Sequence, residues 1–389
     1  MKKKVLTILK DNTMLIALVA VMALFQLLIT AADKGSLLSA QNITNLISQN
    51  AYVIILAVGM LLCILTGGNI DLAVGSIVCL VGAAAGILIV TMGMNIYLAI
   101  VICLVFGTLL GAWQAYWIAY IRIPAFIVTL SGMLLFRGLG NILLDGITIS
   151  PFPKNYTRLF SNYIPTDRAG AFAVSLVVGL VAIAVYIFME LSSRKSKVKK
   201  GYDCESLSSM VVRMVVISAV IFWFFNKLGQ YKGIPVILIW LLVIILSYNY
   251  YTSSTVQGRH FYAMGGNEKA AILSGINTNK ILFIAYTNMG FLSAVSALVV
   301  VSRFNSATPS AGTGYELDAI GACFIGGASA YGGAGTIGGA VIGAILMGVL
   351  NNGMSLLGID ANWQKAVKGL VLLAAVVFDV MSKKRAAKK

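Results

Sequence analysis

Residues 258–276, GRHFYAMGGNEKAAILSGI, form a polar segment between two long apolar runs. Asn267 can accept a hydrogen bond from the first free backbone amides of a short helix, and Glu268 suits the positive end of its dipole. Ser274 and Gly275 end that helix after about two turns. Such a helix cannot cross a bilayer, so the segment predicts a surface element where the chain meets a partner.

The composition around this segment predicts an all-α polytopic membrane protein. Hydrophobic residues make up 59% of the chain and charged residues 11%. A spanning helix needs roughly 20 apolar residues, and we count about 12 apolar runs. They lie near residues 14–30, 51–66, 72–92, 96–120, 123–144, 170–190, 211–226, 234–252, 281–302, 316–332, 337–357 and 363–381.

The net charge of +16 follows membrane topology and gives no reason to expect nucleic acid. Basic residues cluster at both termini, in residues 194–213 and in residues 259–280, as the positive-inside bias predicts for cytoplasmic segments. Both termini are therefore expected in the cytoplasm. Met1 to Ala32 also resembles a secretory signal, but we favour an uncleaved first span because apolar runs follow at once.

Cysteine and histidine usage argues against a metal site and against an enzyme. The five cysteines have no metal-ligand spacing, and four of them lie inside apolar runs. The single histidine, His260, lies in the polar segment. Neither a multi-histidine metal site nor a Ser-His-Asp arrangement within the membrane can be built from it.

Three other segments interrupt the apolar pattern. Residues 192–213 read as a solvated cytoplasmic linker, whose basic run is attracted to anionic lipid. Residues 146–169 are either an ordered outer lid or docking surface, or a plain connector. The glycines at 326–343 favour close helix packing, as do Gly107 and Gly111, over ligand binding. We expect residues 332–335 to break a helix and leave a short or re-entrant span beside them.

Three acids are candidates for membrane depth, namely Asp71, Glu316 and Asp318. A charge there is costly and usually functional. For Asp71 the simpler interpretation is a helix cap without substrate contact. Arg137 could form an interhelical ion pair with one of the acids. An ion-coupled carrier is expected to show more such groups, so the energy source is expected to lie in another chain.

Several motifs resemble the permease subunits of ribose/xylose/galactose-class ATP-binding-cassette importers. They are YAMGGNEKAAILSGI at 262–276, SAGTGYELDAI at 310–320, NNGM at 351–354 and ILTGGNIDLAVGS at 64–76, the last with an apparent extra residue at Asn69. The resemblance covers nearly the whole chain. Residues 123–133 and 136–138 are most similar to the xylose-type and multiple-monosaccharide permeases.

The resemblance implies one permease domain over residues 1–389 in a bacterial cell membrane. A ten-span core would carry a two-span insertion at 170–232, and a cytoplasmic coupling segment would occupy 253–280. Implied partners are a second copy of the chain, a cytoplasmic ATPase, an extracytoplasmic sugar-binding protein and membrane lipid. This chain would carry no cofactor, because ATP and magnesium would bind the partner ATPase.

The resemblance also assigns site residues. ATPase closure would push on the coupling segment, with apolar residues in a groove of the ATPase and charged residues fixing the register. The ATPase-coupling residues are Arg259, Tyr262, Gly265, Gly266, Asn267, Glu268, Lys269, Ala271, Ile272, Leu273, Ser274 and Gly275. An ordinary interfacial helix is the alternative. Weaker candidates for the translocation pathway are Asn69, Asp71, Trp113, Gln114, Glu316, Asp318, Asn351, Asn352 and Trp363.

The function expected from these features is import of a monosaccharide, with xylose or a galactose-like sugar first. The binding protein would perform most of the selection, so the membrane pathway could lack a tight site. Three alternatives stay open: an ion-coupled secondary sugar carrier, an ATP-binding-cassette permease for nucleosides or branched-chain amino acids, and a membrane scaffold without transport.

Overall fold

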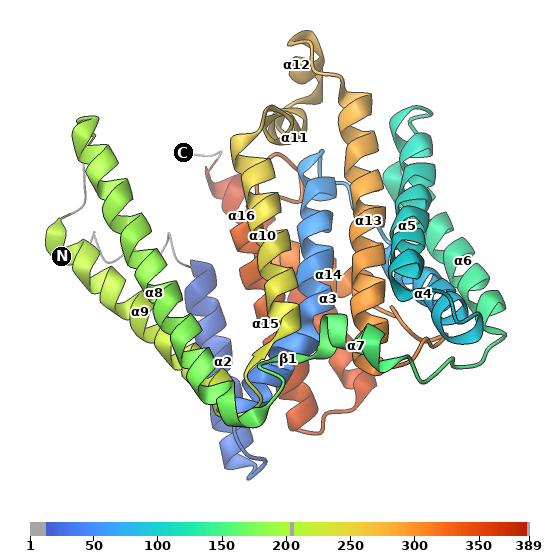
Figure 1. The fold of residues 1–389 in the computed structure, drawn as a ribbon. Coiled ribbons are helices and arrows are strands. Elements are labelled where there is room, and N and C mark those ends of the chain that lie inside the picture. Colours follow the sequence, from blue (N-terminus) through green and yellow to red (C-terminus); the bar gives the residue numbers. More distant parts are fainter. Residues whose placement is uncertain (1–12, 203–205, 387–389) are drawn as a thin grey trace.

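The computed structural model describes residues 13–202 and 206–386 as a bundle of α-helices with one small β-ladder (Figure 1). The elements, in order, are α2 (Thr13–Ala31), α3 (Ala40–Leu65), α4 (Val74–Gly86), the π-helical turn η1 (Ile87–Thr91), α5 (Ile96–Ala119), α6 (Ala125–Leu144), α7 (Lys154–Ser161), β1 (Tyr163–Ile164), α8 (Arg168–Lys199), α9 (Leu207–Gly229), β2 (Ile234–Pro235), α10 (Val236–Ser254), α11 (Val256–Gly266), α12 (Glu268–Leu273), α13 (Thr278–Phe304), α14 (Tyr315–Ile325), α15 (Ile337–Leu356) and α16 (Ala361–Ala386).

Ten helices in the described ranges are long and apolar enough to cross a membrane, which confirms a multi-pass membrane protein. They are α2, α3, α4 with η1, α5, α6, α8, α9, α10, α13 and α15. Ten of the twelve predicted runs therefore correspond to candidate spans. The run at 363–381 forms most of α16, which is not among those ten.

The predicted run at 316–332 is wrong as a span. Helix α14 has 11 residues, about 16 Å at 1.5 Å per residue, which is roughly half of a bilayer core. It ends at Gly326, and Gly327, Gly332, Gly333 and Gly335 then take positive φ before α15 begins. The glycines interrupt the apolar pattern here, as expected for a short helix next to a glycine break.

The centre of the bundle consists of α3, α4, α13 and α15, whose side chains are mostly buried. Small residues bring these helices close to their neighbours, as predicted. A Cβ on Gly111 of α5 would lie 2.8 Å from the Cα of Gly290 in α13. A Cβ on Gly343 of α15 would lie 1.9 Å from the carbonyl oxygen of Ala322 in α14. These positions admit no larger side chain, which is the expected basis of tight packing between membrane helices.

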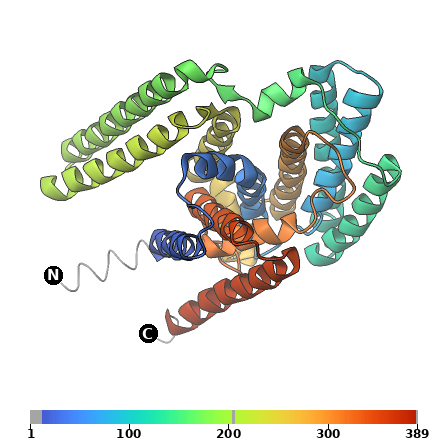
Figure 2. The ribbon, with the colours of Figure 1, turned by 90° about the horizontal axis from the view of Figure 1, so that it is seen from below.

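Helices α8 and α9 form a hairpin that diverges from the rest of the bundle (Figures 1 and 2). The β-ladder closes its base, with Tyr163 opposite Pro235 and Ile164 opposite Ile234. Arg213 of α9 forms an ion pair with Glu190 of α8. The expected linker at 192–213 is largely helical: α8 continues to Lys199 and α9 begins at Leu207, so only residues 200–206 separate them, and 203–205 lie outside the described residues.

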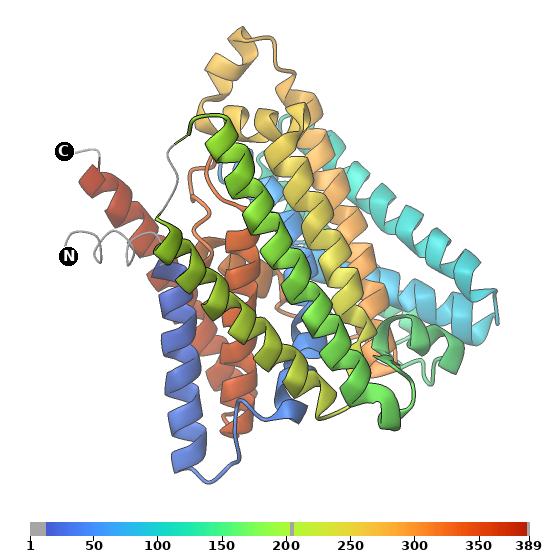
Figure 3. The ribbon, with the colours of Figure 1, turned by 60° about the vertical axis from the view of Figure 1, so that its left-hand side comes forward.

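Helices α11 and α12 lie at one end of the bundle. In Figure 3, α2 begins and α16 ends toward that same end. Helix α8 also ends toward that side (Figure 1). The basic residues at the end of α8 and those of α11 and α12 are therefore on one side of the molecule, whereas the lysines before residue 13 lie outside the described residues. At the opposite end, α7 packs against α13 and β2 against α3, and the Tyr156 hydroxyl donates to the Leu298 carbonyl at 2.8 Å. Residues 146–169 thus form an ordered layer at this end, which we call the outer layer after the side of the membrane expected for it.

Candidate functional site

The α11–α12 corner has the local structure that its sequence predicts. The Asn267 side chain accepts a hydrogen bond from the Ala270 amide at 3.0 Å, and Glu268 occupies the first turn of α12. The helix ends after six residues at Ser274. Gly275 then takes φ +81°, a conformation that favours glycine. Helix α12 is therefore capped at both ends.

Arg122, in the turn between α5 and α6, holds this corner in place. Its Nη1 lies 2.7 Å from Glu268 Oε1. Its Nη2 donates to the Thr278 hydroxyl at 2.9 Å and to the Asn279 side chain. One guanidinium therefore joins the α5–α6 turn, α12 and the start of α13. Sequence reasoning missed Arg122, because its partners are about 150 residues away and no local pattern marks it.

The predicted coupling residues divide into an outward and an inward set. Leu273 is 89% exposed and Ile272 is 52% exposed, and the charged Arg259 and Lys269 are also exposed. Ala271 is buried against its own chain. The outward set presents an apolar tip on α12 with charges around it, which is the pattern of a small protein-binding surface.

Tyr262 belongs to the inward set. Its hydroxyl donates to the Gly335 carbonyl at 2.9 Å, in the loop between α14 and α15. Burial raises the pKa of the Tyr262 phenol above its ordinary value. The phenol therefore remains a hydrogen-bond donor at physiological pH. The side chain connects α11 with the glycine-rich loop and does not face outward.

Gly265 places α11 in backbone contact with two other segments. A Cβ there would lie 1.8 Å from the Leu65 carbonyl oxygen and 2.4 Å from the Gly333 nitrogen. The Gly333 amide donates to that same Leu65 carbonyl at 3.2 Å. We call this contact of Leu65, Gly265 and Gly333 the glycine junction. Gly266, the next residue, has nothing within 4 Å of an added Cβ.

A polar cavity of about 480 Å³ opens at the other end of α3. It lies between the first half of α3, the last turns of α13 and α15, and the start of α14. Amide side chains dominate its lining, among them Asn42, Asn45, Gln49, Asn351 and Asn352. Asn42 and Asn352 hold each other by reciprocal amide hydrogen bonds of 2.8 and 3.0 Å. The cavity suits an uncharged, hydroxyl-rich ligand more than an ion.

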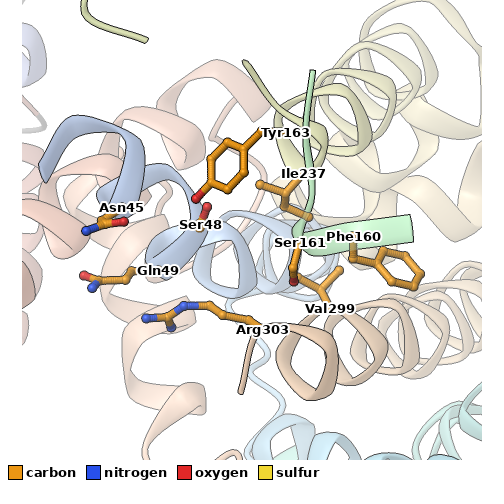
Figure 4. Close-up of a pocket in the computed structure, with 9 residues that line it drawn as sticks. All are labelled: Asn45, Ser48, Gln49, Phe160, Ser161, Tyr163, Ile237, Val299 and Arg303. Carbon is orange, nitrogen blue, oxygen red and sulfur yellow. The ribbon is translucent and has the colours of Figure 1, made fainter. Parts of the chain in front are cut away.

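A smaller pocket of about 200 Å³ adjoins this cavity and shares Asn45, Gln49 and Arg303 with it. Figure 4 shows the Gln49 amide and the Arg303 guanidinium pointing into the same space. Tyr163 of β1 lines the pocket from the outer layer, and its hydroxyl points toward Ser48. The outer layer therefore contributes a wall to this site.

Aromatic and charged groups fix the inner wall of the cavity. The rings of Tyr52 and Tyr315 stack with centroids 3.8 Å apart. The Tyr52 hydroxyl donates to Asp318 Oδ2 at 2.6 Å, and Lys368 Nζ lies 2.8 Å from Asp318 Oδ1. The ion-pair partner of Asp318 is therefore Lys368 and not Arg137. Arg137 instead donates to the carbonyls of Pro309 and Ala311, so its hypothesised pairing with an acid is wrong.

The predicted pathway residues are only partly brought together. Asn351 and Asn352 line the cavity, and Asp318 supports Tyr52 behind its wall. The remaining candidates line neither pocket; they are Asn69, Asp71, Trp113, Gln114, Glu316 and Trp363.

Asp71 lies in the turn before α4, whose N-cap residue is Ala73 and has no side-chain cap of its own. Its Oδ1 accepts the Ala73 amide at 2.8 Å just before α4. Asn69 donates to the Thr66 carbonyl at 3.2 Å in the same turn. Both side chains are thus engaged in shaping the connection between α3 and α4. Within the described residues, no group of three His, Cys, Asp or Glu side chains is placed to hold a metal ion.

The amide stripe on α3 is the main feature that sequence reasoning missed. Asn42, Asn45 and Gln49 follow one another at three- and four-residue spacing, which places them on one helix face. The predicted run began at residue 51, whereas α3 begins at Ala40. A search for polar helical periodicity before each apolar run would have found the stripe.

Comparison with known proteins decides the family. Residues 42–376 match the family described as "Branched-chain amino acid transport system / permease component". This chain belongs to the permeases of ATP-binding-cassette importers. Relatives include the xylose transport system permease protein XylH of Escherichia coli, 37% identical over 96% of this chain and 92% of the relative. XylH of Haemophilus influenzae is 38% identical over 96% of each chain.

A further relative is the ribose import permease protein RbsC of Escherichia coli, 35% identical over 95% of this chain and 94% of its own. No solved structure matches the permease. The chain is a transporter subunit and not itself an enzyme. Membership in this importer family implies an ATPase and a binding protein as partners.

The α11–α12 corner and the polar cavity lie at opposite ends of the permease. The 26 residues of α3 run from the amide stripe at its start to Leu65 at its end, a length of about 39 Å. Helix α13 likewise begins next to α12 and ends at Arg303 and Phe304 beside the cavity. Two continuous helices, α3 and α13, therefore connect the end that carries α12 with the cavity.

Proposed function

We propose that the permease imports a monosaccharide, with xylose as the first candidate and galactose-like hexoses next. Relatives named for xylose and ribose transport, aligned over at least 95% of the chain, support this substrate class. The observation that carries the proposal is the cavity lined by amides and by the stacked Tyr52 and Tyr315. Sugars are commonly held by polar hydrogen-bonding groups together with apolar and aromatic surfaces.

The cavity also bears on the alternative substrates. A branched-chain amino acid carries an ammonium and a carboxylate, and its ammonium would need an acidic or carbonyl-rich partner. Arg303 is the charged residue in the lining, and no acidic side chain is part of it among the described residues. The lining therefore offers an ammonium only neutral amide oxygens and no counter-charge, and we take this to favour a neutral sugar. Nucleosides stay an alternative, since they also carry hydroxyls and an aromatic face.

The partners follow from the two ends of the molecule. An ATPase would bind the tip of α12 at Ile272 and Leu273, with ATP and magnesium held on that ATPase. A sugar-binding protein would deliver substrate above the cavity, next to the outer layer of α7 and the β-ladder. A second copy of the chain would complete the transporter. An even number of spans such as the ten candidates would put both termini on one side, and the basic segments favour the cytoplasm for that side.

Coupling would act through α12 and the glycine junction. ATPase closure would displace α12, and Arg122 would carry the α5–α6 turn and α13 with it. The contact of Gly265 with Leu65 and Gly333 would move the inner end of α3 and the loop before α15. The cavity would then change its access at the other end of these helices.

The test is uptake of labelled xylose, galactose and ribose into proteoliposomes that contain the permease, its ATPase and its binding protein. ATP-dependent accumulation of at least one of these sugars is expected. Uptake driven by an ion gradient without ATPase would point to a secondary carrier. Uptake of leucine or of a nucleoside in place of sugars would reassign the substrate. The absence of any substrate-dependent ATP turnover would favour the remaining alternative, a membrane scaffold without transport.

A further inference from the structure

Arg303 is the charged residue among the side chains that line the polar cavity and its adjoining pocket, and no side chain of the described residues neutralises it. It lies in the last turn of α13 and lines both the cavity and the adjoining pocket. In the part of the chain that the structure describes, its guanidinium makes no hydrogen bond and no ion pair, and its contact is with the ring of Phe304, 5.0 Å away. A guanidinium that lines a pocket and has no protein partner keeps its N–H donors available to a ligand that enters the pocket.

The surroundings of Arg303 define what that ligand is. Gln49 and Asn45 share both pockets with it and offer amide donors and acceptors. Tyr163, Tyr52 and Tyr315 add phenol rings around the same space. A guanidinium presents two parallel N–H groups in a fixed plane. Two adjacent oxygen atoms of a ligand match that fork.

We propose that Arg303 binds two adjacent hydroxyl oxygens of a neutral monosaccharide, and that Gln49 and Asn45 complete this subsite within the membrane permease. The inference rests on the proposed function and deepens it, because it places a defined sugar contact in the chain itself. Selection is then shared between the binding protein and the permease. Sugars that lack a vicinal diol at the contacted position are handed over but enter poorly.

The geometry separates this role from a general attraction for anions. A lysine at the same position keeps the positive charge but loses the planar fork, whereas a glutamine loses the charge and keeps one amide donor. A diol contact therefore predicts that both changes weaken uptake. An anion contact predicts that Arg303→Lys stays close to wild type.

The experiment uses the complete transporter in proteoliposomes and measures initial uptake of labelled xylose against the concentration of sugar-loaded binding protein. Arg303→Lys, Arg303→Gln and Gln49→Ala are compared with wild type. Arg158→Ala is the matched control, because Arg158 is exposed on α7 and lines neither pocket. Detergent unfolding midpoints verify that each variant folds. A second series offers a deoxy analogue of xylose and the corresponding aldonic acid as competitors.

We expect uptake efficiency to fall on the order of tenfold for both Arg303 variants, which is the usual effect of losing a charge-assisted hydrogen-bonded pair. Arg158→Ala should match wild type. The concentration of deoxy analogue needed to compete should differ less between wild type and Arg303→Gln than the uptake efficiency for xylose does. Wild-type kinetics in both Arg303 variants would overturn the inference, as would an aldonic acid that competes better than xylose. Absence of sugar uptake in the wild type would instead refute the proposed function.

Arg303→Gln is expected to fold, since it removes a charge that has no protein partner. If its unfolding midpoint nevertheless falls below that of wild type, the decision passes to Gln49→Ala. An unchanged uptake efficiency in a folded Gln49→Ala would then contradict the subsite. A Gln49→Ala variant with lower uptake efficiency for xylose but unchanged competition by the deoxy analogue would support the subsite.

Discussion

The guanidinium of Arg122 lies 2.7 Å from the carboxylate of Glu268, across 146 residues of sequence. Both side chains are 41% exposed, so the ion pair contributes little to overall stability. Its effect is positional, because Arg122 also binds Thr278 and Asn279 at the start of α13. The ion pair fixes the angle between the coupling helix α12 and the two membrane helices next to it.

Reversal of one charge should therefore uncouple the transporter without unfolding it. We expect Arg122→Glu to reduce ATP-driven uptake several-fold while the unfolding midpoint changes little. The double variant Arg122→Glu with Glu268→Arg should recover part of the uptake. Lys195→Glu, a charge reversal at an exposed lysine of α8 outside the coupling segment, is the control. Equal loss in the single and double variants would contradict the positional role.

Two adjacent glycines give a matched test of the glycine junction. Gly265→Ala would place a Cβ 1.8 Å from the Leu65 carbonyl, whereas Gly266→Ala meets no atom within 4 Å. We expect Gly265→Ala to lower uptake on the order of tenfold or more, because backbone on both sides has to shift. Gly266→Ala should behave as wild type. Similar uptake in the two variants would remove the junction from the coupling path.

The ion pair of Asp318 and Lys368 should matter for stability. Asp318 is almost fully buried, and Lys368 is its charged partner at 2.8 Å. Lys368→Met leaves a buried carboxylate uncompensated, which typically costs about 3–5 kcal/mol. The unfolding midpoint should drop clearly, while Lys365→Met, one turn earlier on α16, should leave it unchanged. The double variant Asp318→Leu with Lys368→Met should lose less than Lys368→Met alone.

The α8–α9 hairpin should be removable. Its base is closed by the pairing of Ile164 with Ile234, so a linker of about two or three glycines can replace residues 165–233. The two helices are mostly unburied, and removal of two spans keeps the remaining topology. We expect the shortened chain to reach the membrane and to support ATP-driven uptake. Failure to fold would assign the hairpin to the core.

The sequence carried enough information for the coupling segment but not for the whole pathway. Asn267, Glu268 and Gly275 act through neighbours in sequence, so capping rules predict α12 correctly. The glycines at 332–335 indicated a short helix beside them, but hydropathy alone extended the run at 316–332 past Ile325, where α14 ends. Asn42 and Asn45 were overlooked because they precede the apolar part of α3.

Contacts between distant segments account for the other omissions. Arg122 meets Glu268, and Lys368 meets Asp318, only after the bundle has formed. Nothing around Arg303 in the sequence distinguishes it from a basic residue that ends a span. Its role depends on the absence of a partner among the described residues, and that property exists only in three dimensions.

The central claim is that α12 is the surface through which an ATPase drives this permease. The most direct measurement is ATP hydrolysis and xylose uptake in the same proteoliposomes, with Leu273→Asp compared with Leu273→Met. Leu273 is 89% exposed, so neither change should unfold the chain. We predict that Leu273→Asp loses ATPase binding and uptake and that Leu273→Met keeps both. Wild-type uptake by Leu273→Asp with the ATPase still bound would contradict the account.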